Sequence, residues 1–243
     1  MMDEWNNFLS EIKQAVQDLG NPREVWFRGH SNANWELVPS LVRTNEWKQK
    51  EKEFFAEFKT SASPLFEKRV NDWEILFDMQ HYGIPTRLLD WTTVLGVAVA
   101  FVLHSDYENT NDSAIFVLDP LALNHLSGKN EVVNLPDDKD FIYDAIYWHN
   151  RPFRAEKPIA IRPPLQSDRI RAQKGVFTVH GNGEETAQFE NYATGCFKKI
   201  ILPALAKEEA RNFLRWANLD EFTIYPDIVG MAQHIKRKIL KGE

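Results

Sequence analysis

The sequence predicts a single α+β domain in which N-terminal helices pack on a central split or mixed sheet. Segments with helical periodicity are interspersed with short β-rich segments, and the connections after residue 110 are too irregular for regular β-α-β winding. No linker rich in Pro, Gly or Ser divides the 243 residues, and 43% hydrophobic content, with 16 Phe and 8 Trp, supplies a substantial core. We therefore expect one domain over residues 1–243, made of an N-terminal helix in residues 1–22 and a core in residues 23–243.

The first half of the chain has the clearer periodicity. Apolar residues between Trp5 and Leu19 recur at three- and four-residue spacing, which predicts an amphipathic helix that ends at Gly20. Another helix begins with Asn71 as its N-cap and ends at Gly83. The other elements expected here are a strand at 24–29, a helix at 47–58, a strand at 86–91, an apolar helix at 93–104 capped by Asp90 or Thr92, and a strand at 113–118.

The second half has weaker patterns. The expected elements are a helix at 140–149, strands at 158–161, 175–179 and 199–202, a helix at 204–217, a strand at 222–225 and a helix from about 226. The dense basic run at 234–241 lies in the last turns of that terminal helix, where cations favour the helix dipole, and we interpret it as a solvated helix end.

Composition and charge exclude several classes of function. A net charge of -6 argues against broad electrostatic capture of nucleic acid. No apolar run approaches a membrane span and no secretory signal is present, so we expect a cytoplasmic protein without a membrane partner. Cys196 is the single cysteine, which we expect to be a buried inert thiol. The histidines show no zinc-ligand spacing, and we expect no metal.

Residues 80–92 are the densest group of functional residue types in the chain. They place His81, Tyr82, Arg87, Asp90 and Thr92 around a Gly-Pro bend, interleaved with apolar residues. Polar groups on such a buried strand need partners, so the segment is either a ligand site or a satisfied structural network that joins a helix to a strand. The position of His81 at a helix C-terminus predicts a raised pKa and a cationic or hydrogen-bonding role.

Two other segments carry candidate ligand-binding groups. Arg28 ends the first strand beside Gly29 and before His30, where a planar guanidinium can bind a phosphate with two hydrogen bonds; pairing of Arg28 with Asp90 is the alternative. Residues 169–177 enter a strand with two arginines and Gln173. They would line a nucleotide cleft or form a solvated turn.

These segments together resemble the FRG domain family, named for Phe-Arg-Gly. The resemblance rests on residues 26–30, 80–92 and 173–177, and on 224–230 near the end. The last motif differs from the usual Phe-Pro-Asp-Leu-Asp-Gly by having Tyr225, Ile228 and Val229. The order of elements is also similar to ADP-ribosyltransferase cores, which bind NAD in the cleft of a split sheet.

The second resemblance implies a role for each candidate. Arg28 would bind phosphate or ribose, and Thr92 would position that arginine or the ribose. His81 and Tyr82 would shape the nicotinamide pocket, and Gln173 would occupy the late-strand position where transferases usually have a glutamate. The remaining candidates are expected to contact the substrate: His30, Arg87 and Asp90, of which Asp90 is the nearby carboxylate that would replace the missing glutamate.

The function that follows is an NAD-consuming enzyme, either an ADP-ribosyltransferase or an NAD glycohydrolase, with NAD as substrate. The resemblance further implies a bacterial or phage toxin or antiphage effector, a protein or nucleic-acid acceptor, and an antitoxin or other partner protein. One alternative is a nucleotide-binding sensor without turnover. A second is a nuclease, which would need clustered carboxylates for a divalent metal.

Overall fold

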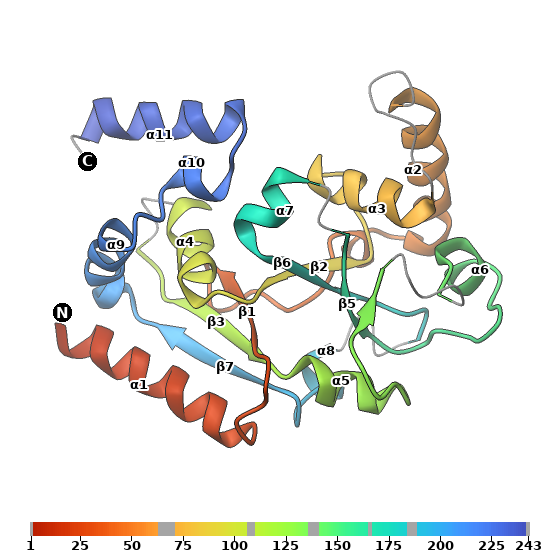
Figure 1. Cartoon of the computed structure of the whole chain (residues 1–243), viewed down its shortest axis with the longest axis horizontal. Coiled ribbons are helices and arrows are strands. Elements are labelled where there is room, and N and C mark those ends of the chain that lie inside the picture. Colours follow the sequence, from red (N-terminus) through yellow and green to blue (C-terminus); the bar gives the residue numbers. More distant parts are fainter. Residues whose placement is uncertain are drawn as a thin grey trace.

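The computed structural model describes residues 2–62, 71–105, 110–135, 141–164, 167–183 and 189–241. These residues form one seven-stranded sheet with the order β4-β5-β6-β2-β1-β3-β7 (Figure 1). Neighbouring strands pair antiparallel except β4 and β5, so the sheet is mixed and the α+β class is confirmed. The strands are β1 (Trp26–His30), β2 (Leu88–Thr92), β3 (Ser113–Leu118), β4 (Val133–Asn134), β5 (Ile159–Arg162), β6 (Gly175–Val179) and β7 (Phe197–Leu202).

Helices cover both faces of the sheet. The α-helices are α1 (Met2–Asp18), α2 (Trp47–Ala62), α3 (Asp72–His81), α4 (Leu95–Ser105), α5 (Pro120–Leu126), α6 (Tyr143–Tyr147), α7 (Asp168–Gln173), α8 (Phe189–Tyr192), α9 (Lys207–Trp216), α10 (Glu221–Ile224) and α11 (Ile228–Lys241). The described residues also contain the short 3-10 helices η1 (Leu41–Arg43) and η4 (Ala204–Ala206). Among the described helices, none is long and apolar enough to cross a membrane.

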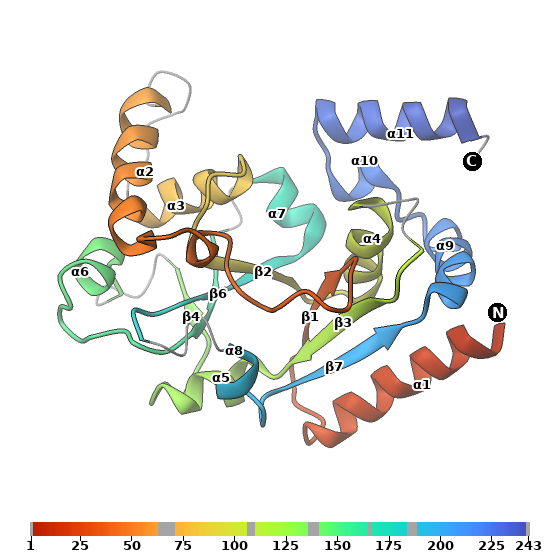
Figure 2. The same ribbon diagram turned by 180° about the vertical axis from the view of Figure 1, so that it is seen from behind.

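Three clusters of buried apolar side chains hold these layers together. One joins α1, α4 and α9 to β3 and β7, and a second joins α2, α3 and α6 to β5 and β6. Alternate residues of β3 separate the first cluster from the third: Ile115 and Val117 face α1 and α4, whereas Ala114 and Phe116 pack with α5 and α8. Figure 2, which shows the molecule from behind, places α1 along β7 at one end and α2 and α6 at the other.

The pairing of neighbouring strands is shortest between β1 and β2. These strands share one register pair, Phe27 with Thr92, whereas β1 makes five pairs with β3 and β2 makes five with β6. Next to that pair, α4 presses against β1 at Gly29, where an added Cβ would lie 2.3 Å from the Ala98 carbonyl oxygen. Glycine is required here because the helix backbone takes the space of a side chain. The sheet therefore stays continuous, but β1 and β2 separate beyond Phe27.

The expected helices and strands are found with two corrections. Residues 222–225 were expected to be a strand, but residues 222–224 lie in α10 and Tyr225 is its C-cap. The helical turn starts because the Asp220 side chain accepts a hydrogen bond from the Thr223 backbone N–H at 2.7 Å. Residues 169–173 were expected to enter a strand and instead form α7, with Ser167 as N-cap. The expected helix at 140–149 is found as α6, and residue 140 lies outside the described residues.

Candidate functional site

A cavity of about 430 Å³ opens where β1 and β2 separate. Its walls come from β1, α3 and α7, with contributions from the segment after β1 and from Tyr225 after α10. Three arginines, two histidines and three carboxylates line it: Arg28, Arg43, Arg169, His30, His81, Glu74, Asp78 and Asp90. The volume is within the range of small-molecule sites.

Arg28 bridges the gap in the sheet. Its Nη1 donates a hydrogen bond to the Asp90 carbonyl oxygen at 2.7 Å and lies 3.7 Å from the carboxylate Oδ2 of the same residue. Burial lowers the pKa of Arg28, and the charge of Asp90 opposes this shift. Because arginine stays protonated in proteins, β1 presents a cation to the cavity that is already paired with β2. The two alternatives for Arg28, a ligand contact and an internal pair with Asp90, are therefore compatible.

His30 is a neutral neighbour of this arginine. Its Nε2 lies 3.1 Å from Arg28 Nε, which donates the hydrogen bond, so Nε2 is the unprotonated ring nitrogen. Burial, and then the charge of Arg28, lower the pKa of His30 to about 3. This histidine lines the cavity as a hydrogen-bond acceptor to Arg28 and is not a cation at neutral pH.

Asp90 is fixed in place by a chain of side-chain hydrogen bonds. Gln80 Nε2 donates to Asp90 Oδ2 at 2.7 Å, and Thr86 Oγ1 donates to Gln80 Oε1. The backbone N–H of Leu88 in turn donates to Thr86 Oγ1 at 3.1 Å. The Asp90 side chain is still 47% exposed, so this network orients a carboxylate that remains accessible at the cavity wall. The dense segment at 80–92 thus contains the structural network and one accessible acid.

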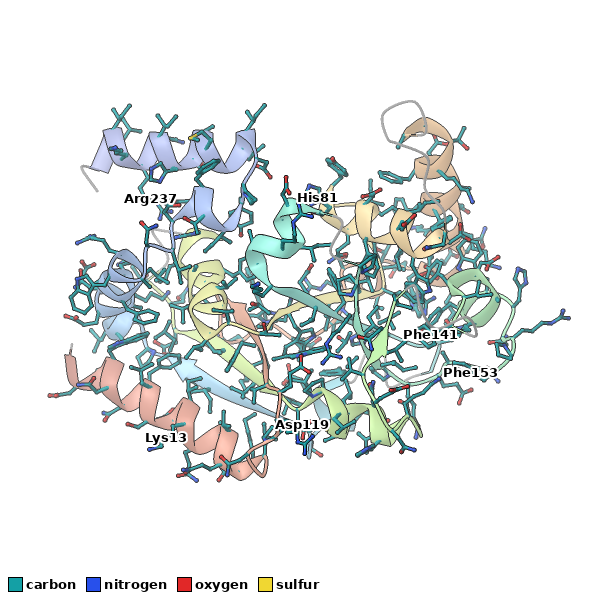
Figure 3. All side chains as sticks on the ribbon, viewed as in Figure 1. Lys13, His81, Asp119, Phe141, Phe153 and Arg237 are labelled. Carbon is teal, nitrogen blue, oxygen red and sulfur yellow. The ribbon has the colours of Figure 1, made fainter. Side chains whose placement is uncertain are left out.

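His81 lies at the end of α3 and faces α7, as Figure 3 shows. Its pKa is lowered, by burial first and then by Arg169, so the expectation of a raised pKa from the helix dipole is wrong. Arg169 Nη1 is also 3.5 Å from the His81 carbonyl oxygen. Tyr82 is exposed, packs edge-on against His81 with ring centroids 4.6 Å apart, and lies outside the lining of the cavity.

Thr92 and Gln173 form a connection behind the cavity. Thr92 is fully buried, and its Oγ1 donates to the Gln173 carbonyl oxygen at 2.7 Å and accepts from the Val94 N–H at the start of α4. Gln173 lines the cavity from the last turn of α7, and not from a late strand as expected. Its Nε2 donates to the Ile224 carbonyl oxygen at 3.1 Å. These contacts join β2, α7 and α10.

Arg87 is directed away from the cavity. Its guanidinium binds both carboxylate oxygens of Glu51, with the Nε to Oε1 distance at 2.6 Å, and Nη1 donates to the His180 carbonyl oxygen. The exposed fractions of the two side chains are 1% and 2%. Burial would lower the pKa of Arg87, but the charge and hydrogen bonds of Glu51 outweigh it and raise the pKa. The substrate contact expected for Arg87 is replaced by a buried ion pair that ties α2 to the sheet.

Several lining residues were not among the sequence candidates. Gln80 lies within the dense segment, and its partners appear only in three dimensions. Arg169, by contrast, belongs to residues 169–177, which were expected to line a cleft or form a solvated turn, and it lines the cavity. It meets Tyr225 there, and its guanidinium lies 4.8 Å from the ring centroid. Trp35 and Arg43 follow β1 and had no signal in the sequence.

In the described part of the chain, no three His, Cys, Asp or Glu side chains are grouped to hold a metal. Burial raises the pKa of Cys196 to about 11.

Comparison with known proteins bears on the fold of the N-terminal part. The chain matches no curated protein and no solved structure. Residues 23–111 match the family described as the FRG domain. The matched range includes β1, α3 and β2, and therefore Arg28, His30, His81 and Asp90; it ends before α7. The match to the FRG domain family therefore covers residues 23–111 of the chain.

Proposed function

We propose that the cavity between β1 and β2 binds NAD and that the protein cleaves the bond between nicotinamide and ribose, as an ADP-ribosyltransferase or NAD glycohydrolase does. The observation that carries the proposal is the opening of the sheet at Phe27, with a cation on one strand and an accessible carboxylate on the other. A cleft in a split sheet is also the place where ADP-ribosyltransferases bind NAD. That fold-level analogy supports the proposal.

The charges of the cavity suit this reaction. Loss of nicotinamide leaves positive charge on the ribose, which a carboxylate close to the sugar stabilises. Asp90 is the accessible acid held in position, by Gln80 and Arg28. Arg169 and Arg43 lie on the other walls, where they would neutralise the pyrophosphate. In this scheme Asp90 stabilises the positive charge, which is the role expected of the glutamate that transferases usually have where this chain has Gln173.

A nucleotide-binding sensor without turnover is the second candidate. The observation in its favour is Gln173, whose amide is bound to the Ile224 carbonyl oxygen and provides no charge. The pairing of Arg28 with Asp90 also leaves less negative charge for an oxocarbenium ion. The nuclease alternative, the acceptor, the toxin or antiphage role and the partner protein remain predictions.

The test is incubation of the purified protein with NAD, with and without cell extract, and measurement of free nicotinamide by chromatography. We expect release that is lost in Arg28→Ala and reduced by a factor of about 100 or more in Asp90→Asn, since this substitution removes the charge and keeps an acceptor for Gln80. Arg171→Ala is the control, because Arg171 lies on α7 outside the cavity lining.

Each candidate function has its own outcome in this assay. Saturable NAD binding without nicotinamide release would favour the sensor. Metal-dependent cleavage of RNA or DNA by the same preparation would favour the nuclease. Equal release by wild type and Asp90→Asn would remove the role proposed for the carboxylate.

A further inference from the structure

The segment that follows β1 and includes η1, residues 31–43, brings Trp35 and Arg43 to the cavity. Trp35 has no role in the site described so far. The segment is held firmly: the Ala33 N–H donates to the Asp112 carbonyl oxygen at 2.9 Å, and the Leu41 N–H donates to the Thr86 carbonyl oxygen at 3.2 Å. The positions of the two side chains therefore follow from the fold.

Trp35 is exposed although its segment has access to the core. Leu37 and Leu41 from the same segment are fully buried, whereas 53% of Trp35 remains accessible. Its ring meets the edge of His30, with centroids 6.3 Å apart at 64°. His30 in turn packs against Phe116 at 5.0 Å. A large flat ring supported from behind and open toward a cavity is suited to stacking against another flat ring.

Arg43 supplies a cation to the same cavity. In the described part of the chain its guanidinium makes one hydrogen bond, from Nη2 to the Val38 carbonyl oxygen at 2.9 Å, and no ion pair. It is close enough to Arg28 and His30 to lower the pKa of both. Lys199 also acts on His30. Positive charge from β1, η1 and β7 is therefore concentrated near Trp35, where it attracts an anion.

We infer that Trp35 and Arg43 form a subsite for a nucleoside monophosphate group, in which the base stacks on Trp35 and the phosphate binds Arg43. The inference deepens the proposed function and rests on it, since it assigns one half of the dinucleotide to residues 31–43. In this assignment Trp35 and Arg43 select the ligand, whereas Arg28 and Asp90 act at the reacting bond.

The test uses three probes that carry different parts of the ligand: AMP has both base and phosphate, adenosine lacks the phosphate, and ribose 5-phosphate lacks the base. Each is titrated calorimetrically into the intact protein. AMP should bind most tightly. Trp35→Ala should weaken AMP about tenfold, which corresponds to loss of one base–aromatic stack, and leave ribose 5-phosphate unchanged. Arg43→Gln should weaken AMP and ribose 5-phosphate and leave adenosine unchanged.

Matched controls separate the subsite from general effects. Trp216→Ala removes another exposed tryptophan, on α9, and Arg171→Gln removes an exposed arginine of α7; neither lines the cavity. Both controls should bind the three probes as the wild type does. The thermal unfolding of all variants is compared to confirm that they fold.

The results that overturn the inference differ from those that overturn the proposed function. Absence of AMP binding to the wild type, or equal loss of all three probes in Trp35→Ala, overturns the subsite. Unchanged KM for NAD in both Trp35→Ala and Arg43→Gln does so as well when nicotinamide is released. If the three probes follow the expected pattern and no nicotinamide is released, the subsite holds and the enzymatic function fails.

Discussion

The buried ion pair of Arg87 and Glu51 allows the most quantitative prediction. Both side chains are almost inaccessible, and Tyr143 donates a further hydrogen bond to Glu51 Oε1 at 2.6 Å. In Arg87→Met the side chain keeps much of its volume but the carboxylate loses its cation. Breaking one partner of such a pair costs about 3–5 kcal/mol, because the remaining charge stays buried without compensation.

The assay is equilibrium unfolding in urea with thermal melting as a second measure. For a chain of this size, each kcal/mol corresponds to about 2–4 °C, so Arg87→Met should melt about 6–20 °C below the wild type. The loss should be smaller at low pH. A buried carboxyl group without a cation has a raised pKa in the folded state, and as the pH falls through that value protonation removes the penalty.

Two further variants test whether the ion pair itself accounts for the loss. Glu51→Met combined with Arg87→Met removes both charges and should recover part of the loss. Arg154→Met breaks the solvent-exposed pair with Glu156 and should cost about 1 kcal/mol or less. If Arg87→Met melts within about 2 °C of the Arg154 control, the buried ion pair does not stabilise the fold.

Three other predictions concern the split between β1 and β2. The pKa of His30, about 3, lies below that of an unfolded histidine, so the unfolded state binds more protons between pH 3 and 6.5 and stability is lost as the pH falls through this range. His30→Gln should flatten that dependence by up to about 1.4 kcal/mol for each pH unit, measured by urea unfolding at pH 4 to 7; an unchanged slope would exclude a neutral buried His30. Asp90→Ala should cost about 1 kcal/mol in the same assay, because the side chain is half exposed, and a loss above 3 kcal/mol would contradict its description as an accessible acid. Gly29→Ala should destabilise by about 1–3 kcal/mol, since its Cβ would overlap the Ala98 carbonyl oxygen, and wild-type stability would show that α4 does not press on β1 as described.

Residues 80–92 show how far the sequence could predict the site. The interleaved apolar residues indicated a buried strand with polar groups that need partners, and the structure has both. The pairing of Asp90 with Arg28 on β1 was one of the two predicted alternatives, whereas nothing in the sequence pointed to the pairing of Arg87 with Glu51 on α2. Such contacts depend on how distant segments are brought together.

Local patterns determined most of the helices and strands of this protein. The N-cap Asn71, the bend at Gly83 with φ near 80° and the apolar periodicity of α1 act within a few residues, so they are visible in the sequence. At 222–225 the β-branched and aromatic residues favoured a strand, and the Asp220 cap together with packing against α11 favoured a helix.

The tertiary structure decided which polar residues face the cavity and what charge they have. Burial and neighbouring arginines lowered the pKa of His30 and His81, and the helix dipole alone had suggested the opposite for His81. The separation of β1 and β2 beyond Phe27 leaves a cavity that Arg28, Trp35 and Arg43 line together. Sequence fixes side-chain chemistry and local periodicity, whereas electrostatics and cavities arise from long-range packing, which no short segment encodes.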